Sequence, residues 1–183
     1  MRWLQLCLVL LLVPLAACSI NHVRNYPAET HAPYTLDAGD VIAVLVYGDD
    51  SLSKSFKVDD TGAIAMPLIG TVRVRGLTTN EASGKIAAAL TNGFMRNPNV
   101  SVQIDTYRPF FIQGAVKNGG QFAYVPQMTV RAAISTAGGY TDTANRNRVT
   151  IYRRNGSVMQ KIGADLDFPI YPGDTIVISE RWL

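Results

Sequence analysis

Few side chains in this sequence have the types and spacing that metal binding or catalysis requires. Its 183 residues include two histidines, His22 and His31, and two cysteines, Cys7 and Cys18. Both histidines lie in a proline-containing segment without hydrophobic periodicity, so they make a poor pair of metal ligands. Because no histidine or cysteine follows residue 31, the rest of the chain cannot assemble a Ser-His-Asp triad. We expect no metal, no cofactor and no catalytic residue.

Pairs of carboxylates are the remaining candidates, because two acids can act together on a glycosidic bond. Asp59 and Asp60 begin a predicted turn, and Asp165 and Asp167 lie near the C-terminus. Acids in turns are usually solvated rather than held in the surroundings that tune a catalytic pKa. The sequence therefore favours a protein that is not an enzyme.

The chemistry that the sequence does offer is acylation of a cysteine thiol. Arg2 and an apolar run over residues 3–13 are followed by small residues, which is the order of parts in a secretory signal. The run is shorter than the roughly 20 residues of a membrane-spanning helix. Leu15-Ala16-Ala17-Cys18 resembles a bacterial lipobox, in which a lipoprotein signal peptidase cuts before the acylated cysteine. We predict a signal peptide over residues 1–17 and lipidation of Cys18.

The segment after the predicted cleavage site reads as a tether. Cys7 leaves with the signal, so no disulfide framework remains. Acyl chains on Cys18 would anchor residues 18–33, which lack periodicity, to a membrane. Ser19 in the next position resembles the outer-membrane sorting pattern of diderm bacteria. The alternative is an ordinary signal whose cleavage site lies near a cysteine.

Charge excludes one class of partner. The formal net charge is +3 at pH 7, and the basic residues are dispersed, so we expect no nucleic-acid binding. One local group stands out, made of Arg146, Arg148, Arg153 and Arg154. This group favours the interpretation that these arginines lie on the solvated face and at the ends of a strand. A contact with an acidic glycan or a neighbouring subunit is the sharper alternative.

Periodicity and turn chemistry predict an α+β fold of two small domains, each a mixed sheet with one helix. The first domain covers residues 34–107 and the second 108–183, because Arg108-Pro109 breaks the strand pattern. The predicted strands are 41–47, 55–58, 63–66, 71–74, 100–104, 110–116, 121–125, 148–154, 157–162 and 175–179.

Helix and turn signals accompany these strands. Thr78 and Glu81 form a predicted capping box before a helix whose apolar face runs from Ala82 to Phe94. Thr129 caps a second helix over 130–137, and Asn155-Gly156 predicts a tight hairpin. Ala38-Gly39-Asp40-Val41 is echoed by Pro172-Gly173-Asp174-Thr175, which convergent turn chemistry explains without a duplicated unit.

Ordered motifs connect the chain to a known family. The first half contains Tyr34-x-Leu36-x-x-Gly39-Asp40-Val41-Ile42, Asp60-x-Gly62-x-Ile64-x-x-Pro67-x-x-Gly70 and Gly76-Leu77-Thr78-x-x-Glu81. The second half contains Phe111-Ile112-x-Gly114-x-Val116, Met128-Thr129-Val130-x-x-Ala133-Ile134-x-x-Ala137-Gly138-Gly139 and Pro172-Gly173-Asp174-x-Ile176. In this order they resemble bacterial polysaccharide export proteins (the outer-membrane polysaccharide exporter, or Wza-like, family): an export domain, then one soluble-ligand-binding β-grasp (SLBB) domain.

The resemblance implies a function in the cell envelope. We expect a lipid-anchored component of a capsular or exopolysaccharide export machine at the periplasmic face of the outer membrane, assembled as a homo-oligomeric ring around the polysaccharide. An inner-membrane polysaccharide co-polymerase is the implied partner. Two departures are Gly119-Gly120, where the family often has Pro-Gly, and the end at Trp182-Leu183 without an amphipathic helix. The expected short form therefore builds a collar, and a separate outer-membrane β-barrel supplies the pore.

The alternative function is a glycan- or ligand-binding lipoprotein that acts as a sensor or scaffold. A monomer that binds a short glycan favours this alternative, whereas a closed oligomer favours export. Four aromatic residues could stack on sugars: Tyr107, Phe110, Tyr140 and Trp182. Such residues more often lie in cores or interfaces, so the sequence alone assigns no polysaccharide-binding residue.

Overall fold

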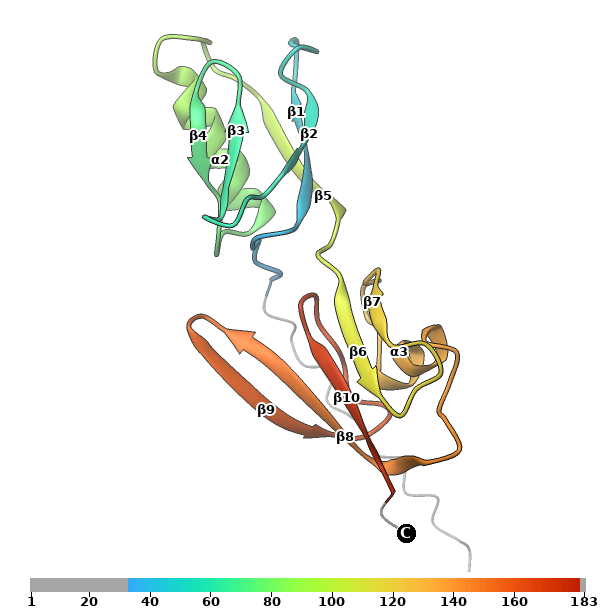
Figure 1. Cartoon of the computed structure of the whole chain (residues 1–183). Coiled ribbons are helices and arrows are strands. Elements are labelled where there is room, and N and C mark those ends of the chain that lie inside the picture. The colour runs from blue at the N-terminus through green and yellow to red at the C-terminus, as the bar shows by residue number, and fades with distance from the viewer. Residues whose placement is uncertain (1–32, 182–183) are drawn as a thin grey trace, which may run out of the picture. The chain divides into compact units, whose positions relative to one another are not determined.

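The computed structural model describes residues 33–181 and shows an α+β fold of three sheets and two helices (Figure 1). The strands are β1 (Val41–Val46), β2 (Lys54–Lys57), β3 (Ala63–Met66), β4 (Gly70–Arg73), β5 (Val100–Thr106), β6 (Phe110–Gly114), β7 (Gly120–Phe122), β8 (Ala144–Asn155), β9 (Val158–Ala164) and β10 (Thr175–Glu180). The helices are α2 (Thr79–Thr91) and α3 (Val130–Thr136). The predicted α+β class is confirmed. None of the helices in this described part is long and apolar enough to cross a membrane.

The first half of the fold is a small sheet, a hairpin and a helix around one core. The sheet has the order β2-β1-β5, β3 pairs with β4, and all of these pairs are antiparallel. Alternate residues of β1, among them Ile42 and Val44, are buried against Ile86 and Leu90 of α2. This part therefore has its own hydrophobic centre.

The predicted capping box of α2 is present. The Thr78 hydroxyl accepts a hydrogen bond from the Glu81 backbone N–H, and the Glu81 carboxylate accepts one from the Thr78 N–H. The Thr78 backbone N–H and the Thr78 hydroxyl both donate to the Glu81 carboxylate, and they lower the pKa of Glu81 because they favour its charged form. The helix thus begins where the sequence placed it.

The end of α2 corrects one expectation. Phe94 does not belong to the helix face: α2 ends at Thr91, and the Phe94 residue is 50% exposed. Gly93, at a φ of 97°, reverses the chain, and the Met95 N–H then donates to the Leu90 carbonyl. Met95 packs against the core in place of the expected phenylalanine.

The second half is a five-stranded sheet of order β7-β6-β10-β8-β9 with α3 against one face. The pair β10–β6 is parallel and the others are antiparallel, so the mixed pairing lies in this sheet. Its core includes Phe110, Ile112, Ile151, Ile176 and Ile178. Thr129 caps α3 as predicted, its hydroxyl accepting from the Ala132 N–H.

All five strands of this sheet differ in their bounds from the predicted strands, and two of them, β7 and β8, show the reason. The returning strand β7 is shorter, because it pairs with only three residues of β6. The strand β8 starts at Ala144 rather than residue 148, because Glu180 of β10 pairs with Ala144 beyond a bulge. Pairing with neighbours far along the chain, which local pattern does not encode, therefore set both lengths.

A close backbone approach makes Gly114 a fold-critical position. It has a φ of 92°, and a Cβ there would lie 2.1 Å from the carbonyl oxygen of Ile178 on the parallel strand β10. We expect Gly114→Ala to lower the free energy of unfolding by more than about 3 kcal/mol, because strain adds to a clash with backbone. Urea denaturation of the full chain would measure the loss.

Gly48→Ala is the matched control. Gly48 also has a positive φ, 84°, but a Cβ there would meet nothing within 4 Å. It should therefore lose about 1 kcal/mol from backbone strain alone. Equal losses in the two variants would contradict the close approach of β6 and β10.

Candidate functional site

Two Gly-Asp turns at the start of β1 and β10 share one construction. In the first turn, residues 37–40, the Asp40 N–H donates to the Asp37 carbonyl, and the Asp37 N–H donates to Asp40 Oδ2 at 2.9 Å. The second turn, residues 171–174, repeats both bonds between Tyr171 and Asp174, the latter at 2.8 Å. Each aspartate therefore closes its own turn with its side chain.

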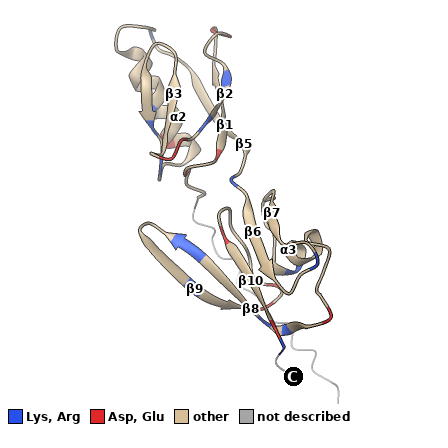
Figure 2. Cartoon of the chain, viewed as in Figure 1, with Lys and Arg blue, Asp and Glu red and all other residues tan. Residues whose placement is uncertain are grey.

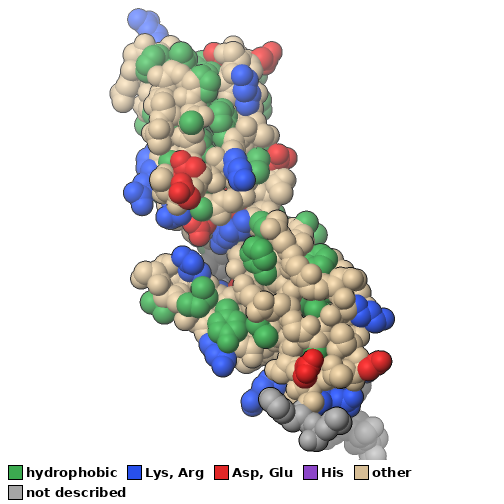
Figure 3. Space-filling model, viewed as in Figure 1, with side chains coloured by type: hydrophobic (Ala, Val, Ile, Leu, Met, Phe, Trp, Pro, Cys, Tyr) green, Lys and Arg blue, Asp and Glu red, His purple; other side chains and the backbone are tan. Residues whose placement is uncertain are grey.

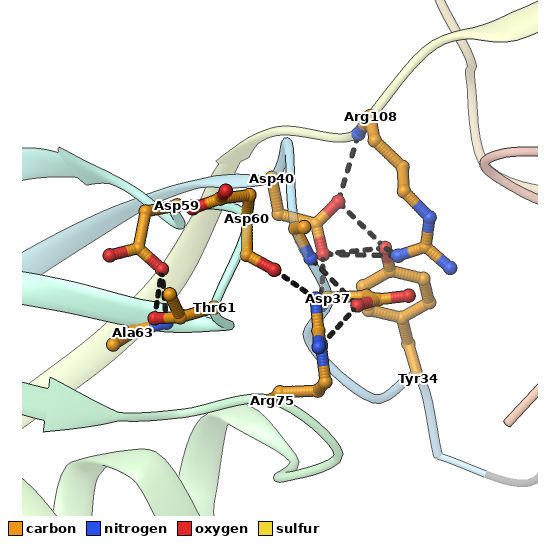
Figure 4. A network of polar contacts seen from close by, with 10 residues as sticks. Tyr34, Asp37, Asp40, Asp59, Asp60, Thr61, Ala63, Arg75 and Arg108 are labelled. Atoms are coloured by element: carbon orange, nitrogen blue, oxygen red, sulfur yellow. Dashed lines mark hydrogen bonds and ion pairs between the residues drawn. The ribbon is translucent and has the colours of Figure 1, made fainter. Parts of the chain in front are cut away.

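Asp40 is fully buried and fully hydrogen-bonded (Figure 4). Its carboxylate accepts the Tyr34 hydroxyl at 2.8 Å and the Arg108 backbone N–H at 2.9 Å. The Arg108 guanidinium adds an ion pair, with Nη1 3.2 Å from Asp40 Oδ2, and also lies over the Tyr34 ring. A buried carboxylate is tolerated when it is paired and saturated in this way.

Asp174 has an equivalent set of partners. Its relative exposure is 1%, and Arg153 holds it with two bonds, Nε to Oδ1 at 2.9 Å and Nη2 to Oδ2 at 2.7 Å. The same guanidinium lies 4.1 Å from the centroid of the Tyr171 ring. Both turns thus combine a glycine, a buried aspartate, an arginine and a tyrosine.

The connection between β5 and β6 lies against both turns. Arg108 N–H binds the first turn, and the second turn donates from Gly173 N–H to the Pro109 carbonyl at 3.0 Å. A Cβ at Gly39 would lie 3.3 Å from Arg108 Cβ, and one at Gly173 would lie 2.9 Å from Arg108 Nε. Both glycines have a positive φ, 94° and 86°, which is the conformation that favours glycine, and an added side chain would also crowd Arg108. We call these two turns and residues 107–110 the paired-turn site.

Three tyrosine rings contact one another in series at the paired-turn site. Tyr107 makes edge contacts with Tyr34 at 5.0 Å and with Tyr124 at 5.5 Å between ring centroids. Burial raises the pKa of the Tyr34 hydroxyl far above its usual value, against an opposing effect of Arg108. Burial likewise raises the pKa of Tyr124. Tyr34 therefore stays protonated and acts as a hydrogen-bond donor.

The site offers structural bonds rather than reactive groups. Both lone-pair-bearing oxygens of Asp40 and of Asp174 are occupied by donors, so neither is placed to take a proton from a substrate. No group of three or more His, Cys, Asp or Glu suited to a metal ion occurs within residues 33–181. The arrangement fixes backbone geometry where two strands start.

Of the four acids considered from the sequence, Asp59, Asp165 and Asp167 bind neighbouring groups through their carboxylates, and Asp60 does so through its backbone carbonyl. The Asp59 carboxylate accepts from the Thr61 hydroxyl and the Ala63 N–H, which lowers the pKa of Asp59. The Asp60 carbonyl accepts from Arg75, which also pairs with Asp37 (Figure 4). Asp165 caps a turn through the Asp167 N–H, and Asp167 pairs with Arg131.

The other sequence candidates are scattered. Phe110 is buried in the second core, and Tyr107 lies between two tyrosines. The Tyr140 hydroxyl is buried without a hydrogen-bond partner among the described residues. Cys18, Trp182 and both histidines lie outside the described residues. Of the four candidate sugar-stacking aromatics, the structure describes Tyr107, Phe110 and Tyr140, and no ring contact joins these three to one another.

Sequence reasoning missed the paired-turn site, although a signal was present. The echo between residues 38–41 and 172–175 marked both turns, and the structure shows that the resemblance extends to side-chain bonding. Arg153 was expected on the solvated face of a strand, and this expectation is wrong, because its side chain is mostly buried and pairs with Asp174. Neither arginine partner was predictable, since Arg108 lies 68 residues from Asp40 and Arg153 lies 21 from Asp174.

Comparison with known families defines the class of protein. Residues 28–105 match the family described as polysaccharide biosynthesis/export protein, and residues 109–161 match the SLBB domain. The two matches lie in the order of an export domain and then an SLBB domain, and together they span most of the chain. The chain belongs to this family of Wza-like polysaccharide export proteins.

Three curated relatives illustrate the family. An exopolysaccharide production protein ExoF of Rhizobium meliloti is 30% identical over 100 residues, 54% of this chain and 24% of the relative. The polysialic acid transport protein KpsD of Escherichia coli is 24% identical, over 81% of this chain and 28% of the relative. The EPS I polysaccharide export outer membrane protein EpsA of Ralstonia nicotianae is 28% identical, over 72% and 35%. The matched part spans about a quarter to a third of these relatives.

The buried aspartate of the first turn yields a stability prediction. Asp40→Asn should lower the free energy of unfolding by about 3–5 kcal/mol, because Arg108 loses its charge partner and an amide presents donors to donors. Urea denaturation at pH 7 checks this. Asp37→Asn is the control. Asp37 pairs with Arg75, and the side chains of Arg75 and Asp37 are 40% and 35% exposed, so this substitution should lower the free energy of unfolding by less than about 1 kcal/mol. A small effect of Asp40→Asn would contradict the saturated geometry.

The raised pKa of Tyr34 predicts a loss of stability in alkali. Above about pH 10 the unfolded tyrosine ionises while the folded one stays neutral, so the free energy of unfolding falls as pH rises. Tyr34→Phe removes this contribution, and its stability should therefore fall less steeply between about pH 10 and 12. Tyr47→Phe, at a residue 79% exposed, should retain the wild-type slope. Parallel slopes for Tyr34→Phe and wild type would count against the buried hydroxyl.

Proposed function

We propose that this protein is a lipid-anchored, periplasmic component of a capsular or exopolysaccharide export machine at the outer membrane. The observation that carries the proposal is the joint match of an export domain and an SLBB domain in one chain. In this proposal residues 34–107 form the export domain and residues 108–183 form the SLBB domain. Residues 1–17 are removed, and lipid on Cys18 attaches the tether 18–33 to the membrane.

The names of the three relatives support a role in the cell envelope. One is an outer membrane protein for export of a polysaccharide, one transports polysialic acid, and one takes part in exopolysaccharide production. By this proposal the present chain handles a secreted polysaccharide and performs no catalysis. The engaged carboxylates of the paired-turn site are consistent with that role.

The proposed assembly is a ring of identical copies that forms a collar around the polysaccharide. A closed ring needs a heterologous interface, in which two different surfaces of each copy meet. Within the described residues both larger sheets are open, with β2, β5, β7 and β9 as edge strands. Unpaired strand edges are surfaces through which chains associate. A polysaccharide co-polymerase would deliver the chain from the inner membrane, and a separate outer-membrane protein would supply the pore.

The anchor and the export role are tested together in cells. Deletion of the gene should remove high-molecular-weight polysaccharide from the medium and the cell surface. Wild-type protein should restore export and Cys18→Ala should not, because the variant lacks the thiol that is acylated. Cys7→Ala is the matched control and should restore export fully, since that cysteine leaves with the signal. Unchanged polysaccharide after deletion would contradict the export role.

The collar is tested on the purified, detergent-solubilised protein. Its molar mass, measured by light scattering, should correspond to a closed oligomer. A monomer that binds a short glycan would favour the alternative sensor or scaffold function. Ion conduction by this protein alone across a lipid bilayer would contradict the separate pore.

A further inference from the structure

The five-stranded sheet has a second face, opposite the core, that neither helix of residues 33–181 covers. Strand pairing aligns one residue from each strand in a continuous row across this face: Gln121, Phe111, Thr175, Tyr152 and Lys161. A second row contains Gln113, Val177, Thr150 and Gly163, and a third pairs Arg154 with Met159. We call these three rows the open face.

Burial separates the two faces of the sheet. In the three central strands the residues Ile112, Ile151 and Ile176, each next to a member of the first row, are nearly inaccessible and belong to the core. On the open face Phe111 is 42% exposed and Met159 54% exposed, and the Tyr152 residue is half-buried. The pairing register of the strands thus leaves an aromatic side chain and a methionine side chain exposed to solvent.

The open face is basic. Residues 144–164, which form the β8–β9 hairpin, contain five Arg or Lys and no Asp or Glu (Figure 2). Arg153 points to the other face, where Asp174 neutralises it. Arg154 and Lys161 lie on the open face and form no ion pair with a described residue. Figure 3 shows hydrophobic and basic side chains next to one another over this hairpin.

The row pattern suits a sugar polymer. Phe111 and Tyr152 lie on either side of Thr175, two strand spacings apart, which is about 10 Å. Flat rings at this spacing can stack on sugar rings two residues apart in an extended glycan. Amide and hydroxyl groups of Gln121 and Thr175 supply hydrogen bonds to sugar hydroxyls. Unpaired Lys161 and Arg154 supply charges that complement carboxylates.

We propose that the open face of the β7-β6-β10-β8-β9 sheet binds an acidic polysaccharide, through Phe111 and Tyr152 as stacking residues and Arg154 and Lys161 as partners of its anionic groups. The inference rests on the proposed export function and assigns to it the chemical class of the cargo and a contact surface.

A second copy of this chain is a poorer fit for the same face. Lysine, which this face carries at Lys161, is depleted at the centres of protein interfaces. A two-fold contact of this face with itself would also bring two basic surfaces together. Charge complementarity therefore favours an anionic glycan.

The test measures binding of the full mature chain to polygalacturonate, a polymer of an acidic sugar, by affinity electrophoresis. The double variant Arg154→Ala/Lys161→Ala should bind about tenfold more weakly, because two exposed charge contacts are lost. The control variant Lys54→Ala/Arg96→Ala removes two basic residues that are exposed and lie outside this sheet. It should bind as tightly as wild type. Arg154→Lys/Lys161→Arg keeps both charges and should retain binding. Phe111→Ala should weaken binding without changing net charge.

Three results would overturn the inference. Equal affinity of the two double-alanine variants would remove the basic residues from the site. Equally tight binding of neutral dextran by wild type would remove the acidic class of ligand. If the Arg154→Ala/Lys161→Ala variant differed from wild type in oligomer mass but bound polygalacturonate equally well, the open face would be assigned to contacts between copies. Each result concerns the purified protein, so it is distinct from failure of the export role, which the gene deletion reports.

Discussion

A buried carboxylate needs a full set of donors, and this requirement shapes the centre of the protein. Asp40 and Asp174 are essentially inaccessible, and each accepts bonds from an arginine side chain and a turn N–H. Asp40 also accepts from the Tyr34 hydroxyl and the Arg108 backbone N–H. Leaving either unpaired would cost several kcal/mol, as for any buried charge without a partner. The strands β1 and β10 start at these turns, so the position of both strands depends on the bonds of two side chains.

The same bonds hold the connection between β5 and β6. Arg108 contributes its backbone N–H and its guanidinium to the first turn, while its side chain lies against the glycine of the second. Tyr107 adds ring contacts on both sides. A connection held by charged hydrogen bonds keeps its geometry better than a connection held by solvated loops, because each bond must break before the backbone can move.

The five-stranded sheet distributes its side chains according to register. One set of residues builds the core with α3, and the set one position away forms the open face. A shift of pairing by one residue would exchange the two sets. Gly114 helps to prevent such a shift, because its backbone lies against that of Ile178 with no room for a side chain. The proposed glycan surface therefore depends on the same packing that stabilises the second core.

Local chemistry in the sequence determined most elements and the class of fold. The Thr78–Glu81 capping box, the Asn155-Gly156 hairpin and the alternation in β1 act within a few residues, so pattern alone predicts them. The ordered glycines and caps also indicated the family that the comparisons then showed. Tertiary structure decided what depends on distant partners. The pairing of Asp40 with Arg108, the withdrawal of Arg153 from solvent and the row from Gln121 to Lys161 arise only when separate strands meet. Their physical reason is register and burial, which join residues that local sequence keeps apart.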